Sequence, residues 1–239
     1  MTPIAPHITT FLRKRLVDER NASSNTCESY SYAFKLLFEF AAARLKTQPS
    51  KLVFEQIDAT LVVDFLGHLE VARGNGINSR NTRLAAIKSF MHFMQYRLPT
   101  ALEQIQRVLA IPSRKTETRL VKHLTVQEMQ AILDAPVPID REGIRDRAML
   151  HLCFAGGLRV SELVGLRLDD LKLLPNASIL VNGKGRKQRC LPLWKQTSSA
   201  LRAWLDVRGQ TGASQLFLNA KGDGMTRSGF DYILSKHAK

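Results

Sequence analysis

The chain has 239 residues, with 35 Lys and Arg against 21 Asp and Glu, a formal net charge of +14. This length allows one large or two modest domains, with enough core to fold without disulfides or a structural metal. A hydrophobic content of 44% excludes an intrinsically disordered chain. The charge favours a polyanionic partner, nucleic acid before a membrane surface, although a merely basic protein has the same composition.

Residue spacing excludes several other classes of protein. The three cysteines are far apart and the six histidines fall at no metal-ligand spacing, so neither a disulfide framework nor a metal site is expected. No apolar run approaches the roughly 18 residues of a membrane span, and the first residues lack the apolar core of a signal peptide. We therefore expect a cytoplasmic protein that does not enter a membrane.

The first 110 residues have the apolar periodicity of helices. From Thr26, apolar residues recur on one helical face. Asp58 is placed to cap a second helix, a third is expected from about Ser79 to Tyr96, and a weaker helical segment covers 101–109. The short connections between these segments predict a bundle of four or five helices.

A polar, charged and aperiodic stretch then separates two expected domains. We assign residues 1–111 to a helical domain, 112–122 to an exposed linker and 123–239 to a second domain. Both domains are basic, which fits two domains that grip one duplex.

The second domain is expected to be mainly helical with a small antiparallel sheet. Thr125 and Glu128 form a capping box at the start of its first helix. The further expected elements are a helix over 140–155, strands over 178–182 and 189–193, a helix over 195–207, an apolar stretch over 216–218 and a last helix capped by Thr226.

One arginine is expected at the beginning of a helix, in Gly157-Leu-Arg159-Val-Ser-Glu162. There it opposes the helix dipole, at a cost of about 0.3–1 kcal/mol unless an anion answers it. A phosphate at that point would meet the guanidinium fork together with free backbone N–H groups, and Glu162 is close enough to orient Arg159. A surface Arg–Glu pair at this spacing is common, and in isolation it is the simpler interpretation.

The expected hairpin has a basic tip, Gly183-Lys184-Gly185-Arg186-Lys187. The glycines allow its backbone to approach a partner closely, and Lys184 can deliver a proton or a charge to a phosphate oxygen. A solvated basic turn explains the same residues equally well.

The two motifs in this order resemble a known family. Residues 147–193 are similar to the first half of the catalytic domain of tyrosine recombinases, the phage-integrase and Xer-type family. The family's TGLRxSEL box corresponds to GGLRVSEL, and its GKGxKxRxVPL hairpin to GKGRKQRCLPL. Residues 25–40 and 78–90 resemble the helical core-binding domain of the family. The resemblance implies a mainly α fold with a small antiparallel β-sheet, a helical core-binding domain followed by a partial catalytic domain.

The resemblance also implies roles for individual residues. Arg159 would be the first of two arginines that clamp the scissile phosphate, Lys184 would protonate the leaving 5′ oxygen, and Glu162 would support them. These roles agree with phosphoryl transfer, which requires a cation at the non-bridging oxygens and a proton for the leaving group. No metal or nucleotide cofactor is implied, and the implied partners are double-stranded DNA and other recombinase protomers bound to it.

Further DNA contacts are expected from the polar side of the third helix and from the hairpin tip. An ordinary solvated helix face is the alternative. The residues expected to contact DNA are Ser79, Arg80, Thr82, Arg83, Lys88, Arg186 and Lys187.

Residues 1–239 depart from the family pattern in one respect. They contain no H-x-x-R box, no further catalytic His or Trp after it and no matching nucleophilic tyrosine. Three tyrosines lie in the first domain, and we expect Tyr232 on the apolar side of the last helix. The sequence thus predicts a C-terminally truncated recombinase that cannot form a covalent intermediate by itself. The alternatives are a non-cleaving module that occupies recombination sites and a decayed remnant without function.

Overall fold

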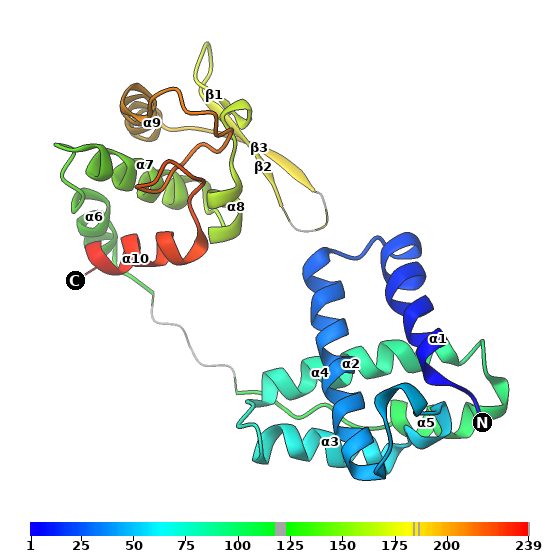
Figure 1. The fold of residues 1–239 in the computed structure, drawn as a ribbon. Coiled ribbons are helices and arrows are strands. Elements are labelled where there is room, and N and C mark those ends of the chain that lie inside the picture. Colours follow the sequence, from blue (N-terminus) through cyan, green and yellow to red (C-terminus); the bar gives the residue numbers. More distant parts are fainter. Residues whose placement is uncertain (118–122, 184, 186, 239) are drawn as a thin grey trace. The chain divides into compact units, whose positions relative to one another are not determined.

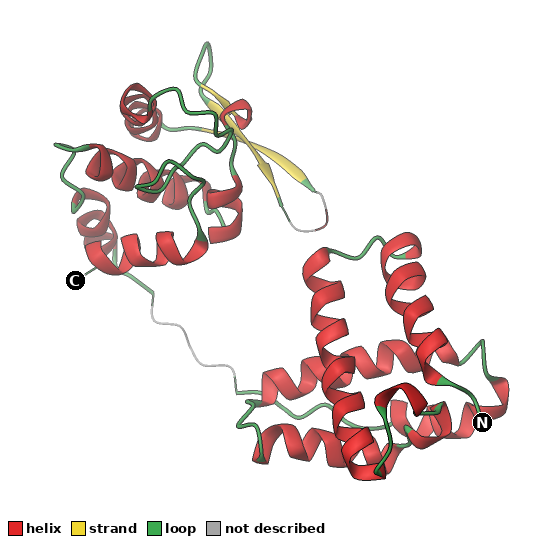
Figure 2. Cartoon of the chain, viewed as in Figure 1, coloured by secondary structure: helices red, strands yellow, loops and turns green. Residues whose placement is uncertain are grey.

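The structure is a computed structural model, and it describes residues 1–117, 123–183, 185 and 187–238. The chain divides into two compact units, Met1–Leu120 and Val121–Lys239. Helices dominate both units, and a three-stranded antiparallel sheet lies in the second (Figure 2). The mainly α fold class with a small sheet is confirmed. The finer division at 112–122 stays a prediction.

The first unit is a helical bundle around one hydrophobic core (Figure 1). A π-helical stretch, Phe11–Glu19, follows its first helix without a break, and short 3₁₀ turns join the later ones. Its α-helices are α1 (Ile4–Thr10), α2 (Ser24–Leu45), α3 (Ala59–Val71), α4 (Ile77–Met94) and α5 (Leu102–Leu109).

Local capping and apolar periodicity explain these helices. The Asp58 carboxylate accepts the backbone N–H of Leu61 at 2.7 Å, as expected for the cap of α3. Leu84 and Ile87 on α4, which are spaced for one helical face, are fully buried. Two helix starts differ slightly from the prediction. Helix α2 is capped by Ser23, before the predicted start near Thr26, and α4 begins at Ile77, before the predicted Ser79. Helix ends are the least certain part of a sequence-based assignment.

The beginning of the predicted linker is tied to the first unit. The Asn81 side chain on α4 donates to the Arg114 carbonyl oxygen at 2.8 Å and accepts the Arg114 N–H at 3.0 Å. The Arg114 guanidinium also donates to Glu70 on α3 at 2.7 Å. Residues 112–117 are exposed, as predicted, but Arg114 is held in place by these contacts.

The second unit has its own hydrophobic core, in which Trp204 and Phe217 stack at a centroid separation of 6.3 Å. Helix α7 packs against α6 and α9, and α8 packs against α10. The elements are α6 (Val126–Asp134), α7 (Arg141–Gly156), α8 (Val160–Gly165), β1 (Leu171–Lys172), β2 (Ser178–Asn182), β3 (Gln188–Pro192), α9 (Lys195–Arg208) and α10 (Arg227–His237).

The predicted hairpin and caps of the second unit are confirmed. Strand β2 pairs antiparallel with β3 from the Ser178–Pro192 pair to the Asn182–Gln188 pair. Figure 1 shows this hairpin projecting from the helices of the unit. Thr125 and Glu128 form the expected capping box, and Thr226 accepts the N–H of Gly229 at 3.0 Å. Strand β3 begins one residue before its predicted start, and the two-residue strand β1 was not predicted.

Candidate active site

A buried carboxylate, Glu162 on α8, is the centre of the candidate site. Its side chain is 4% exposed. Its Oε2 atom accepts the backbone N–H of Arg159 at 3.0 Å, and its Oε1 atom accepts a guanidinium N–H of the same residue at 3.0 Å. The predicted pairing of these two residues is therefore present, and the backbone contact fixes the start of α8 as well.

A second arginine binds the same carboxylate. Arg189 on β3 donates from Nη1 to Oε1 of Glu162 at 3.2 Å and from Nη2 to Oε2 at 2.8 Å. The hydrogen bond from Arg189, ahead of those from Arg159, lowers the pKa of Glu162 from 4.5 to about 2. Glu162 in turn raises the pKa of Arg189. The sequence analysis did not single out Arg189, although it stands within the GKGRKQRCLPL motif.

The Arg159 guanidinium remains accessible. Its side chain is 68% exposed, and Glu162 is its carboxylate partner among the described residues. Helix α8 has only six residues, so the expected contribution of a helix terminus to anion binding is small. The accessible guanidinium itself is the feature that suits a phosphate.

The hairpin base lies against this cluster. A Cβ atom added to Gly183 would lie 3.4 Å from both Arg189 Nη1 and Glu162 Oε1, and 3.3 Å from the Lys187 carbonyl oxygen. The Gly183 N–H donates to that carbonyl at 2.8 Å and closes the turn. Lys187 is exposed, as its predicted role requires. The predicted residues Lys184 and Arg186 lie outside the described residues.

The polar residues predicted to share one face of α4 do not do so. Ser79 and Thr82 are exposed, whereas Arg80 is only 7% exposed and lies 3.8 Å from Glu70. Successive residues of a helix are about 100° apart, so Arg80 points away from the face that carries Ser79. The prediction that Arg80 lies on the exposed polar side is wrong. Lys88 is half-buried and lies on another side of the helix.

Arg83 is partly held by α2. Its Nη1 atom lies 3.4 Å from the Ser29 hydroxyl, and its guanidinium carbon lies 4.9 Å from the centroid of the Tyr32 ring. Arg73 donates to the Tyr32 hydroxyl at 3.5 Å. One arginine on α4 and one in the turn after α3 thus lie near the same tyrosine of the first unit.

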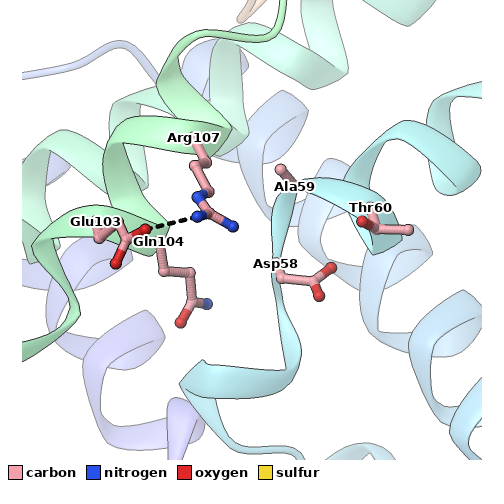
Figure 3. Close-up of a pocket in the computed structure, with 6 residues that line it drawn as sticks. All are labelled: Asp58, Ala59, Thr60, Glu103, Gln104 and Arg107. Carbon is pink, nitrogen blue, oxygen red and sulfur yellow. Dashed lines mark hydrogen bonds and ion pairs between the residues drawn. The ribbon is translucent and has the colours of Figure 1, made fainter.

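A surface hollow of the first unit, between the start of α3 and α5, is separate from these residues (Figure 3). Arg107 there donates to Glu103 at 2.6 Å. Gln104 donates to the carbonyl oxygens of Phe54 and Ile57, at 2.9 and 3.1 Å. These side chains satisfy local backbone and surface groups.

The expected position of Tyr232 is wrong. It is 70% exposed on α10, whereas Phe230 and Ile233 of the same helix are buried. The apolar side of α10 is therefore defined by Phe230 and Ile233, and Tyr232 faces solvent.

Comparison with known proteins identifies the family. Residues 122–239 match the phage integrase family, and residues 8–97 match the phage integrase N-terminal SAM-like domain. A putative integrase/recombinase of Sinorhizobium fredii is 43% identical to this chain, and the alignment covers 98% of this chain and 70% of the relative. A tyrosine recombinase XerC of Pelobacter propionicus is 34% identical, and the alignment covers 99% of this chain and 76% of that relative. The chain belongs to the tyrosine recombinase, or phage integrase, family.

Solved structures share the fold. The site-specific recombinase XerH, in a post-cleavage complex with difH DNA, aligns with a TM-score of 0.65 at 23% identity, over 96% of this chain and 67% of its own. A lambda integrase tetramer bound to a Holliday junction aligns with a TM-score of 0.68 at 13% identity, over 100% of this chain and 66% of its own. Within the described residues, no helix has the length and apolar character needed to cross a membrane.

Proposed function

We propose that this protein binds double-stranded DNA in the cytoplasm and takes part in site-specific recombination by phosphoryl transfer. The observation that carries the proposal is the Arg159–Glu162–Arg189 cluster, in which one buried carboxylate holds an exposed guanidinium at the base of a basic hairpin. Its family relatives are named integrases and recombinases, and the XerH and lambda integrase neighbours are DNA complexes. Other protomers of the recombinase are the proposed partners on DNA.

In the proposed reaction a tyrosine hydroxyl attacks the scissile phosphate and the 5′ oxygen of the next nucleotide leaves. Arg159 binds non-bridging oxygens, whose charge grows in the transition state. Lys184 gives a proton to the leaving oxygen. The Glu162 carboxylate holds Arg159 by accepting both the backbone N–H and a guanidinium N–H of Arg159. This chemistry needs no metal ion.

We propose the two units, joined through 112–122, as the two halves of a DNA clamp. In the first unit the proposed contacts are Ser79, Thr82 and Arg83, which are at least partly exposed, with Lys88 at the side. At the hairpin tip they are Arg186 and Lys187. We do not propose Arg80 as a direct DNA contact. It is buried, and it supports this surface through its interactions with Glu70 and Asn81.

Salt dependence of DNA binding tests the clamp. If about six phosphates are contacted, the slope of log K against log salt concentration is about −5. Arg159→Ala and Arg83→Ala should each reduce the magnitude of this slope by about 1. Arg107→Ala, which removes an exposed arginine of α5 paired with Glu103, is the control. A slope near zero for the unaltered protein would contradict DNA binding.

A non-cleaving DNA-binding role for residues 1–239 is the second candidate. The four tyrosines of the chain are Tyr30, Tyr32, Tyr96 and Tyr232, and none stands in a segment that resembles the family's nucleophile box. Because attack needs an oxygen held about 3–3.5 Å from phosphorus, arginine and lysine alone cannot start the reaction.

Covalent trapping on a nicked duplex separates the two candidates. Residues 1–239 should give no phosphotyrosine adduct, whereas the chain extended with the C-terminal segment of a family member should be trapped. In the extended protein, Arg159→Ala or Lys184→Ala should slow trapping by about 100-fold or more. An adduct formed by residues 1–239 that disappears in Tyr232→Phe would assign the nucleophile to the exposed Tyr232.

A further inference from the structure

The Glu162 carboxylate is fully occupied, and the two arginines bind it in different ways. A carboxylate offers about four acceptor positions. Arg189 fills two of them with a parallel pair of N–H groups, at 3.2 and 2.8 Å, and Arg159 fills the others with its backbone N–H and one guanidinium N–H. The two-pronged geometry, which is the strong form of an arginine–carboxylate contact, therefore belongs to Arg189.

This division leaves most of Arg159 available. A guanidinium has five N–H donors. Within the part of the chain that the structure describes, Glu162 accepts one of the Arg159 guanidinium donors, and the Arg159 side chain is 68% exposed. Arg189 is less accessible, at 37%, because its terminal nitrogens point to Glu162. The two arginines thus have different tasks although they share one carboxylate.

The carboxylate would not stay half-paired if Arg189 were absent. Glu162 is 4% exposed, and a buried charge that loses a partner must find another or be protonated. Arg159 is the nearest replacement, since it already contacts Oε1. A two-pronged contact with Glu162 would then use the donors that a phosphate needs.

We propose that Arg189 is a positioning residue: by binding Glu162 through both terminal nitrogens, it keeps the Arg159 guanidinium free for a DNA phosphate. The inference rests on the proposed function, because it assumes that Arg159 binds phosphate. Gly183 lies close to Arg189 and Glu162, since an added Cβ atom would be 3.4 Å from each, which places the hairpin base beside the same arrangement.

A mutant cycle on DNA affinity tests the inference, with the full chain and a mixed-sequence duplex at fixed low salt. Arg189→Gln and Arg159→Gln should each weaken binding by about tenfold. The double variant should be no weaker than either, because both changes remove the same phosphate contact. Arg202→Gln on α9, an equal loss of charge at an exposed position, is the control and should weaken binding much less.

Removal of the Glu162 charge should reverse the defect. In Arg189→Gln/Glu162→Gln, no carboxylate competes for Arg159, so affinity should return most of the way to that of the unaltered protein. Arg189→Lys keeps the charge without the fork and should recover only part of it. Additive losses in the double variant, no recovery with Glu162→Gln, or full affinity in Arg189→Lys would each overturn the inference.

A second measurement does not depend on DNA. Titration of the Glu162 carboxyl carbon by NMR should give a pKa near 2 in the unaltered protein and a higher value in Arg189→Gln. An unchanged value would show that the pair is not formed and would overturn the inference. If the titration shifts as expected but the unaltered protein does not bind duplex DNA, the proposed function fails while the Arg189–Glu162 pair stands.

Discussion

At the scale of a single residue, Glu162 combines a structural ion pair with the supporting role proposed for it. A buried carboxylate is costly unless every acceptor position is used. In this protein two arginines supply the donors, and they come from the start of α8 and from β3. The same contacts that offset the desolvation of the carboxylate also orient the guanidinium proposed to bind phosphate.

Glu162→Gln should therefore destabilise the second unit at neutral pH by about 2 kcal/mol, because hydrogen bonds to a charged group are lost. The folded-state pKa of Glu162, about 2, lies below its ordinary value of 4.5, so the folded unit binds fewer protons than the unfolded chain. The stabilisation is present above about pH 4.5 and is lost as the pH falls toward 2. Urea denaturation should show that the free energies of unfolding of the unaltered protein and of Glu162→Gln become equal as the pH falls over this range. A difference that stays constant to pH 2 would contradict the ion-pair origin.

At the scale of an element, helices of this protein are bounded by side-chain caps and fitted to their neighbours by small residues. Asp140 caps α7 by accepting the Gly143 N–H at 2.7 Å. Gly143 lies in the first turn of α7, where a Cβ atom would be 2.0 Å from the Val137 carbonyl oxygen. The segment before α7 can pass this close because position 143 has no side chain.

Two glycine-to-alanine changes should have opposite effects on stability. Gly143→Ala forces the Val137 backbone away and should destabilise the second unit by about 1–3 kcal/mol. Gly67→Ala lies within α3 with open space around the added methyl group, so it should stabilise the first unit by about 0.5–1 kcal/mol. Thermal unfolding of each variant measures these changes in stability. Stabilisation by Gly143→Ala would contradict the close approach of Val137.

The whole molecule consists of two units with separate hydrophobic cores. Ile87 on α4 and Ile179 on β2 are fully buried members of the first and second core, respectively. Because the cores share no residue among those described, each should lose its structure in its own cooperative transition.

Calorimetry with a matched pair of variants checks this independence. Ile87→Val and Ile179→Val each remove one buried methylene and should cost about 0.5–1.5 kcal/mol. Ile87→Val should lower the midpoint of one transition and Ile179→Val that of the other, by a few degrees each. A single transition that both variants shift equally would show that the units unfold together.

The sequence by itself determined the local features of this protein. Apolar periodicity and the caps at Asp58, Thr125 and Thr226 predicted the main helices, and alternation around a glycine-rich turn predicted the β2–β3 hairpin. The Arg159–Glu162 pair was also predictable. All of these depend on residues within a few positions of each other, where backbone geometry fixes which side chains meet.

Only the tertiary structure decided the contacts between distant residues. Arg189 reaches Glu162 across 27 positions, Asn81 holds the Arg114 backbone across 33, and Tyr232 faces solvent because Phe230 and Ile233 take the apolar side of α10. Arg80 is a charged residue and was expected on the protein surface, but it is buried beside Glu70. Such outcomes depend on which elements pack together, and helical spacing alone does not specify the neighbour that a side chain will meet.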